Sequence, residues 1–276
     1  MGTRKRECSM LSIQAQLVSK FPFLRLLMSS PKTDRVAHLD FLFPHSHSSL
    51  QAESWAKTVK AIDHDKDMCF VNSISYCKRQ ERKKHEFLVA EILHQRTGLK
   101  NQVIVDRSPQ PSSDGDRDSA ARASSKISSQ VAAHDQIRIS GCEELRAITH
   151  DFQPFIILAT RTFTSPPSLL EFAVLVVVVH EHAPVYDVIQ HQCYWYSDTV
   201  WRALGNDRYG PQTKESKDWI NRGKYGAISV GRDSLSGIEQ EFVEALNAAQ
   251  REALSRKEEA EAQKQKVCNI LLCRAC

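Results

Sequence analysis

The longest apolar segment of this 276-residue chain restricts what it can fold into. Residues 169–179 are almost wholly apolar, and the unbroken run at 172–179 is less than half of the roughly 20 residues that a membrane-spanning helix needs. The segment follows two prolines and Ser168, a residue type that often caps the N-terminus of a helix. We therefore predict a soluble protein with a helix buried on all sides here, although the valine-rich half fits a central strand equally well.

Composition and charge argue against several classes of partner. Lys and Arg number 37 and Asp and Glu 33, so the net charge of +4 is too balanced for a nucleic-acid-binding protein. The basic run at 78–84 is interpreted as a solvated face, and no nucleic-acid partner is expected. The eight cysteines are scattered along a lysine-rich chain without a secretory signal, which favours the reducing cytoplasm. The basic N-terminal segment makes a mitochondrial location the weaker alternative.

The histidine and cysteine spacings do not complete a metal site. Cys273 and Cys276 are close in the chain, but a zinc site needs a second pair or nearby histidines, and Cys268 is the only other candidate. His180 and His182 have a strand-like spacing and no obvious third ligand. We therefore expect neither a metal ion nor another cofactor.

Composition divides the chain into three parts. Residues 1–51 have no long periodic pattern and are expected to form an irregular arm. Residues 52–236 carry the mixed patterns of an α+β domain, interrupted at 108–133 by a polar stretch that buries too little apolar surface to become ordered and is expected to be a mobile insert. Residues 237–276 continue as an amphipathic helix and a charged tail, with an apolar stripe at Ile238, Phe242, Leu246, Ala249 and Ala253.

Short apolar runs predict a small antiparallel sheet in the α+β domain. The runs at 85–93 and 102–106 are separated by Gly98 and read as a hairpin. Residues 136–140 predict a further strand, and residues 155–158 are either a strand or part of a loop.

Two more helices are expected beside the apolar one. The pattern at 52–84 is compatible with helix until it becomes strongly basic. A buried helix is predicted at 193–204, closed by Gly205. In the polar stretch that follows, Trp219 and Tyr225 are expected to anchor the chain to the domain.

One cysteine stands at a place where thiols become reactive. Cys193 lies among aromatic residues at the expected first turn of the 193–204 helix. A helix N-terminus carries about half a positive charge, which stabilises a thiolate, and its N–H groups can stabilise a developing oxyanion. The alternative interpretation makes Cys193 a small buried apolar residue, the usual fate of a free cysteine.

A nucleophilic cysteine needs a base, usually a histidine, and a third group that orients the base. His85 begins the first strand of the predicted hairpin and Asp106 ends the second, so antiparallel pairing makes them neighbours. His191 is a second candidate base, but it shares the local chain with Cys193. The alternatives are that His85 ends the basic run at the surface and that Asp106 and Arg107 form an exposed ion pair.

These residues resemble a known enzyme family. A cysteine that opens a buried helix after an aromatic-rich approach, preceded by a strand that starts with His85, resembles the lecithin–retinol acyltransferase branch of the NlpC-type papain-like thiol enzymes. The Cys-Tyr-Trp block is also similar to one found in uncharacterised fungal proteins. The resemblance implies a permuted papain-like fold in which Cys193 is the nucleophile, His85 the base and Asp106 the orienting group. The chain departs from that pattern at Gln192, where the family has Asn, and at Tyr194, where it has an acidic residue.

The combined expectation is a cysteine-dependent hydrolase or acyltransferase that acts on an amide or ester bond of an unknown acyl or amide substrate. The sequence does not distinguish hydrolysis from transfer. The alternative is a catalytically inactive thiol-enzyme scaffold that binds a protein partner, or itself in a coiled coil, through residues 238–266.

Overall fold

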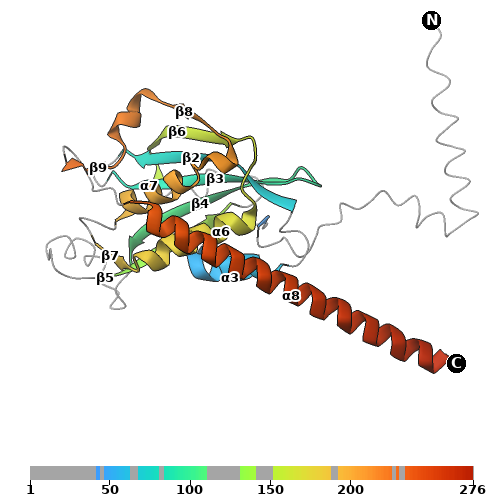
Figure 1. The fold of residues 1–276 in the computed structure, drawn as a ribbon. Helices are drawn as coiled ribbons and strands as arrows, with labels where there is room; N and C mark the ends of the chain where they lie inside the picture. The colour runs from blue at the N-terminus through green and yellow to red at the C-terminus, as the bar shows by residue number, and fades with distance from the viewer. Residues whose placement is uncertain are drawn as a thin grey trace, which may run out of the picture. The chain divides into compact units, whose positions relative to one another are not determined.

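The computed structural model describes residues 42–43, 47–62, 68–80, 84–110, 131–140, 152–187, 192–225, 228–229 and 234–275. These belong to the unit Phe41–Cys276 and have an α+β fold (Figure 1). The strands that form the main sheet are β1 (Ser48–Gln51), β2 (Cys69–Arg79), β3 (Glu86–His94), β4 (Lys100–Pro109), β5 (Val131–Ile139), β6 (Phe155–Phe163), β7 (Val185–Tyr186) and β8 (Pro211–Glu215). The described helices are α3 (Ala52–Ala61), α6 (Leu169–His182), α7 (Cys193–Ala203) and α8 (Ser236–Ala275).

The main sheet is antiparallel and has the order β1-β5-β4-β3-β2-β6-β8, with β7 paired to β5. Two further short strands, β9 (Lys224–Tyr225) and β10 (Ile228–Ser229), pair with each other. α7 lies against β3 and β4, and α6 contacts α3, α7 and α8. The order of the strands puts the β3–β4 pair near the centre of the sheet, and α7 packs over it (Figure 1).

The predicted hairpin is confirmed. β3 and β4 pair with Leu88 opposite Val105, and their connection turns at Gly98, whose φ is 70°. A positive φ is readily adopted only by glycine, which explains why a glycine stands at this turn. The strand expected at 136–140 is part of β5, and the segment at 155–158 is the first half of β6.

The apolar segment is a helix and not a central strand. Its first turn has the predicted cap: Glu171 N–H donates to Ser168 Oγ, and Ser168 N–H donates to the Glu171 carboxylate. Such a reciprocal cap satisfies two backbone donors that the helix leaves unpaired. α6 then buries most of its side chains on all sides and ends before Ala183 and Pro184.

Two expectations for the N-terminal half were wrong. The pattern at 52–84 is helical only in α3, because the residues after it form β2, which pairs on both sides with β3 and β6. β-branched and aromatic side chains at alternate positions of β2 are buried, so sheet packing overrides the helix-compatible composition. Residues 48–51, placed in the irregular arm, form β1 and pair with β5.

The helix predicted at 193–204 is present as α7, but Gly205 does not end it in the predicted way. The last residue of α7 is followed by Leu204 as the C-cap, and Gly205 lacks the positive φ of a glycine cap. A Cβ at Gly205 would lie 2.9 Å from the carbonyl oxygen of Arg202 and 3.2 Å from Nη1 of Arg161, so close packing explains this glycine. None of the described helices has the length and apolar character needed to cross a membrane.

α8 is longer than its buried part. Of the predicted apolar stripe, Ile238, Phe242, Leu246 and Ala249 are buried, and α8 contacts α6. Further along, Arg256 Nη2 donates to the carbonyl oxygen of Lys60 in α3, at 2.9 Å. Most residues from 250 to 266 are exposed. The insert predicted at 108–133 was too long, because Ser108 and Pro109 end β4 and residues 131–133 begin β5. Residues 111–130 of this insert and most of the arm at 1–51 lie outside the described residues.

Candidate active site

Cys193 is the first residue of α7, with Gln192 as the N-cap. Its sulfur is a free thiol, and the residue is 4% exposed. α7 packs on β3 and β4, and Cys193 lies within hydrogen-bonding reach of His85, the residue before β3. The cysteine thus lies where the helix dipole is positive, as expected from the sequence.

His85 and Asp106 are neighbours on this hairpin. Leu88 pairs with Val105. If this register is continued by one residue, Asp106 lies opposite Phe87. His85 lies two residues before Phe87 in the chain, so the side chains of His85, Phe87 and Asp106 are on the same face of the sheet. His85 Nε2 and Asp106 Oδ1 form a short hydrogen bond, and the two side chains are 20% and 4% exposed.

Cys193 and Asp106 both act on the imidazole of His85. Burial alone lowers the pKa of His85, but the charges of Cys193 and Asp106, and a hydrogen bond to each, raise this pKa well above the ordinary histidine value. The structure therefore brings the three predicted residues together in the order Cys193–His85–Asp106. The alternative, in which His85 only ends the basic run at the surface, is wrong, because its ring is largely buried and hydrogen-bonded to Asp106.

Aromatic and cationic side chains hold this series in place. The ring of His85 stacks on Phe152 at 5.9 Å and on Phe87 at 6.3 Å between centroids. Arg138 Nη2 lies 3.7 Å from Asp106 Oδ2, and its guanidinium covers the ring of Phe152 at 4.8 Å. His85 and Arg138 therefore contact different oxygens of the Asp106 carboxylate, which restricts its rotation.

Tyr186, at the end of β7, also borders the thiol. Burial raises the pKa of Tyr186, and the charges of Cys193 and Asp106 raise it further, against smaller opposing effects of a hydrogen bond from the Cys193 backbone N–H and of the Arg107 charge. The phenol is therefore neutral at physiological pH. Its hydroxyl is a polar group next to the backbone of Cys193.

Asp106 and Arg107 do not form the exposed ion pair that was considered as an alternative. Successive residues of a strand point to opposite faces, so Arg107 turns away from Asp106. Its Nε and Nη2 bind the two carboxylate oxygens of Asp135 at 2.7 and 2.6 Å, and both side chains are buried. The guanidinium also lies 4.6 Å from the ring of Tyr196 and 5.2 Å from that of Trp195.

The remaining histidine candidates lie elsewhere. His180 Nδ1 is 2.7 Å from Asp135 Oδ2, and His182 Nδ1 is 3.1 Å from Glu241. Within the described part of the chain, no three or more His, Cys, Asp or Glu side chains are grouped as metal ligands. His191 lies outside the described residues.

Sequence reasoning missed the residues that support the site. Arg138 had a detectable signal, because it lies two residues after Gln136, the partner of Asp106, and so on the same face of β5. Tyr186 had only its place in the aromatic-rich approach to Cys193. Phe152 lies far along the chain from the hairpin, and no local pattern indicated its stacking on His85.

Replacement of the carboxylate tests this arrangement. In Asp106→Asn, the pKa of His85 should fall, because both the charge and the charge-assisted hydrogen bond that raise it are removed. Titration of the His85 ring protons by NMR measures this change. Glu91→Gln, on the same hairpin and paired with Lys100, is the matched control and should leave the titration unchanged. An unchanged pKa of His85 in Asp106→Asn would show that the carboxylate does not act on the ring.

Comparisons with known proteins add no family to these observations. No family model matches the chain. Searches of curated proteins and of solved structures also give no significant match.

Proposed function

We propose that this chain is a cysteine-dependent hydrolase or acyltransferase that acts on an amide or ester bond. The observation that carries the proposal is the meeting of Cys193, at a helix N-terminus, with His85 and Asp106. These are the three roles that nucleophilic catalysis by a thiol requires: nucleophile, base and orienting group.

The chemistry follows from the contacts. The Cys193 sulfur attacks the acyl carbon and forms a C–S bond, while backbone N–H groups of the first turn of α7 stabilise the oxyanion. His85, carrying the proton taken from the thiol, gives it to the departing alcohol or amine as the C–O or C–N bond breaks. Water, or an acceptor alcohol or amine, then loses a proton to His85 and attacks the thioester, which releases the acyl product and restores the thiol. Asp106 keeps the ring oriented throughout.

The papain-like assignment is part of the same proposal. A helix that begins with the cysteine and packs on an antiparallel sheet that carries the histidine is the arrangement implied by the resemblance. The order His85, Asp106, Cys193 along the chain corresponds to the permuted branch.

Binding of a partner through residues 238–266 remains a prediction in a narrower form. The apolar stripe at the start of α8 is already buried within this chain, so it does not provide a free surface. The exposed surface of α8 consists of the other face of its first half and of most residues after 250. No described contact favours this role over catalysis.

Alkylation by iodoacetamide tests the proposal directly. At pH 6, less than about 1% of an ordinary thiol is ionised, so a cysteine paired with a histidinium should react about tenfold or more faster than a simple thiol. In His85→Ala this advantage should disappear. Mass spectrometry of the labelled peptides follows Cys193 separately, with the buried Cys77 as an internal reference. Equal labelling of Cys193 in both proteins, at the rate of a simple thiol, would refute the proposal.

A further inference from the structure

Three side chains of β5 continue the polar series beyond Asp106. His134, Gln136 and Arg138 occupy alternate positions of this strand, and Gln136 is the cross-strand partner of Asp106. Alternate residues of a strand point to the same face, so all three lie on the face of the sheet that carries Asp106. Each of them is partly exposed. The row therefore connects the carboxylate of the proposed active site with groups that solvent reaches.

The hydrogen bonds of this row have a defined direction. Arg138 Nη2 donates to Gln136 Oε1 at 3.2 Å, and Gln136 Nε2 lies 2.9 Å from His134 Nε2. Because a guanidinium only donates hydrogen bonds, the amide oxygen of Gln136 faces Arg138 and its NH₂ group faces His134. An amide NH₂ also only donates, so His134 Nε2 is the acceptor and the ring proton is on Nδ1. Nδ1 is buried and has no hydrogen-bond partner among the described residues.

The row ends on the carboxylate that orients His85. The same Arg138 Nη2 that donates to Gln136 lies 3.7 Å from Asp106 Oδ2. The other carboxylate oxygen, Oδ1, is hydrogen-bonded to the imidazole of His85. The closer Arg138 lies to Asp106, the more its positive charge offsets the negative charge that acts on His85. The position of Arg138 therefore affects how strongly the site favours a protonated imidazole.

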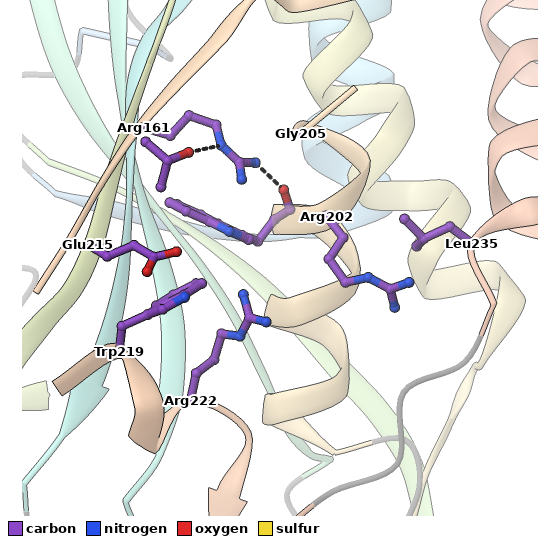
Figure 2. Close-up of a pocket in the computed structure, with 9 residues that line it drawn as sticks. Arg161, Arg202, Gly205, Glu215, Trp219, Arg222 and Leu235 are labelled. Atoms are coloured by element: carbon purple, nitrogen blue, oxygen red, sulfur yellow. Dashed lines mark hydrogen bonds between the residues drawn. The ribbon is translucent and has the colours of Figure 1, made fainter. Parts of the chain in front are cut away.

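A second group of arginines lies at the far end of α7 and does not belong to this row. A cavity of about 410 Å³ there has Arg161, Arg222 and Trp219 among the residues that line it (Figure 2). Arg161 lies 4.1 Å from the ring centroid of Trp201, and Arg222 lies 3.9 Å from that of Trp219. From Cys193 to Trp201 the helix rises by about 12 Å, so these cations are separate from the proposed active site.

We infer that Gln136 is a positioning residue for the proposed reaction and that protonation of His134 changes its effect, an inference that rests on the proposed function. When His134 Nε2 takes a proton from solvent, it becomes a donor that faces the NH₂ group of Gln136. The amide then turns so that its oxygen accepts from His134, and Arg138 loses this acceptor. Arg138 Nη2 already approaches Asp106 Oδ2, so the guanidinium moves onto the carboxylate. The charge that acts on His85 is then weaker, and the reactive thiolate–imidazolium pair is less populated.

Acidification is the signal to which this row responds. Histidine is the residue type that ordinarily changes charge between about pH 5 and 8. The charged or titratable groups near His134 in the described part of the chain come from the strands around it. They are Asp106 of β4, Arg138 of β5 and His85 on the same face, Asp135 on the opposite face, and the neutral phenol of Tyr186 on β7.

Alkylation of Cys193 by iodoacetamide at pH 6 and pH 7.5, followed in the full chain by mass spectrometry, tests the inference. His134→Gln keeps an uncharged acceptor, so its rate should equal that of the wild type at pH 7.5 and exceed it by about threefold at pH 6. Gln136→Leu removes the acceptor from Arg138 at every pH, so it should react about threefold more slowly than the wild type at pH 7.5. Both replaced side chains are partly exposed, so neither substitution empties a buried position.

The double variant His134→Gln/Gln136→Leu separates transmission through Gln136 from a direct effect of the charge on His134. It should react like Gln136→Leu at both pH values, because Gln136 carries the effect. His180→Gln, which replaces another histidine bonded to a neighbouring side chain, is the matched control and should follow the wild type.

Two results would overturn the inference and leave the proposed function standing, provided that Cys193 keeps its dependence on His85. One is equal rates of His134→Gln and the wild type at pH 6. The other is a double variant that reacts about threefold faster than Gln136→Leu at pH 6. Wild-type Cys193 that reacts like a simple thiol would instead overturn the proposed function, and this inference with it.

Discussion

With p-nitrophenyl acetate, the wild-type chain should form an acetyl thioester on Cys193, and His85→Ala should do so about 10²–10⁴ times more slowly. The variant loses the imidazole that lies beside the sulfur and that we propose as the acceptor of the thiol proton. The rate of p-nitrophenolate release measures acylation, and mass spectrometry with hydroxylamine treatment identifies the thioester. Cys193→Ala should form no hydroxylamine-sensitive adduct at this peptide.

A matched histidine variant separates the site from general effects. His180 also hydrogen-bonds a buried carboxylate, and its pKa is raised chiefly by the hydrogen bond to Asp135. It does not belong to the Cys193–His85–Asp106 series, so His180→Ala should acylate at the wild-type rate. Equal acylation rates in His85→Ala and the wild type would show that His85 is not the base. Loss of the rate in His180→Ala alone would locate the chemistry elsewhere.

Local rules were sufficient where a segment carried its own boundary signals. Ser168 identified the start of α6, and Gly98 identified the hairpin turn. They failed for residues 69–79, because nothing in the local pattern shows that β2 is enclosed between β3 and β6. Such a central strand is specified by its neighbours, and one of them, β6, comes from a distant part of the chain.

The same division applies to the site. The meeting of His85 and Asp106 followed from antiparallel pairing, and the place of Cys193 followed from the helix start. The stacking of Phe152 on His85 and the hydrogen bond between Tyr186 and Cys193 depend on how loops return to the sheet. Sequence periodicity contains no information about where such loops place Phe152 and Tyr186 relative to the sheet.

Asp135→Ala should lower the free energy of unfolding by about 3–5 kcal/mol, measured by urea denaturation, because Arg107 would keep its charge without the carboxylate that binds it. Both side chains are at most 1% exposed, so bulk water does not screen the charge that remains on Arg107. Lys100→Gln, which breaks the exposed pair with Glu91, is the matched control and should change stability by less than about 1 kcal/mol.

The double variant Arg107→Met/Asp135→Leu distinguishes the value of the ion pair from the cost of breaking it. Two apolar side chains of similar size leave no buried charge, so most of the stability lost in Asp135→Ala should return. His180 loses its acceptor as well, but its side chain is 16% exposed and can become neutral or bind water. If the double variant is as unstable as Asp135→Ala, then the pair itself, and not the unpaired charge, stabilises the packing of α7 on the sheet.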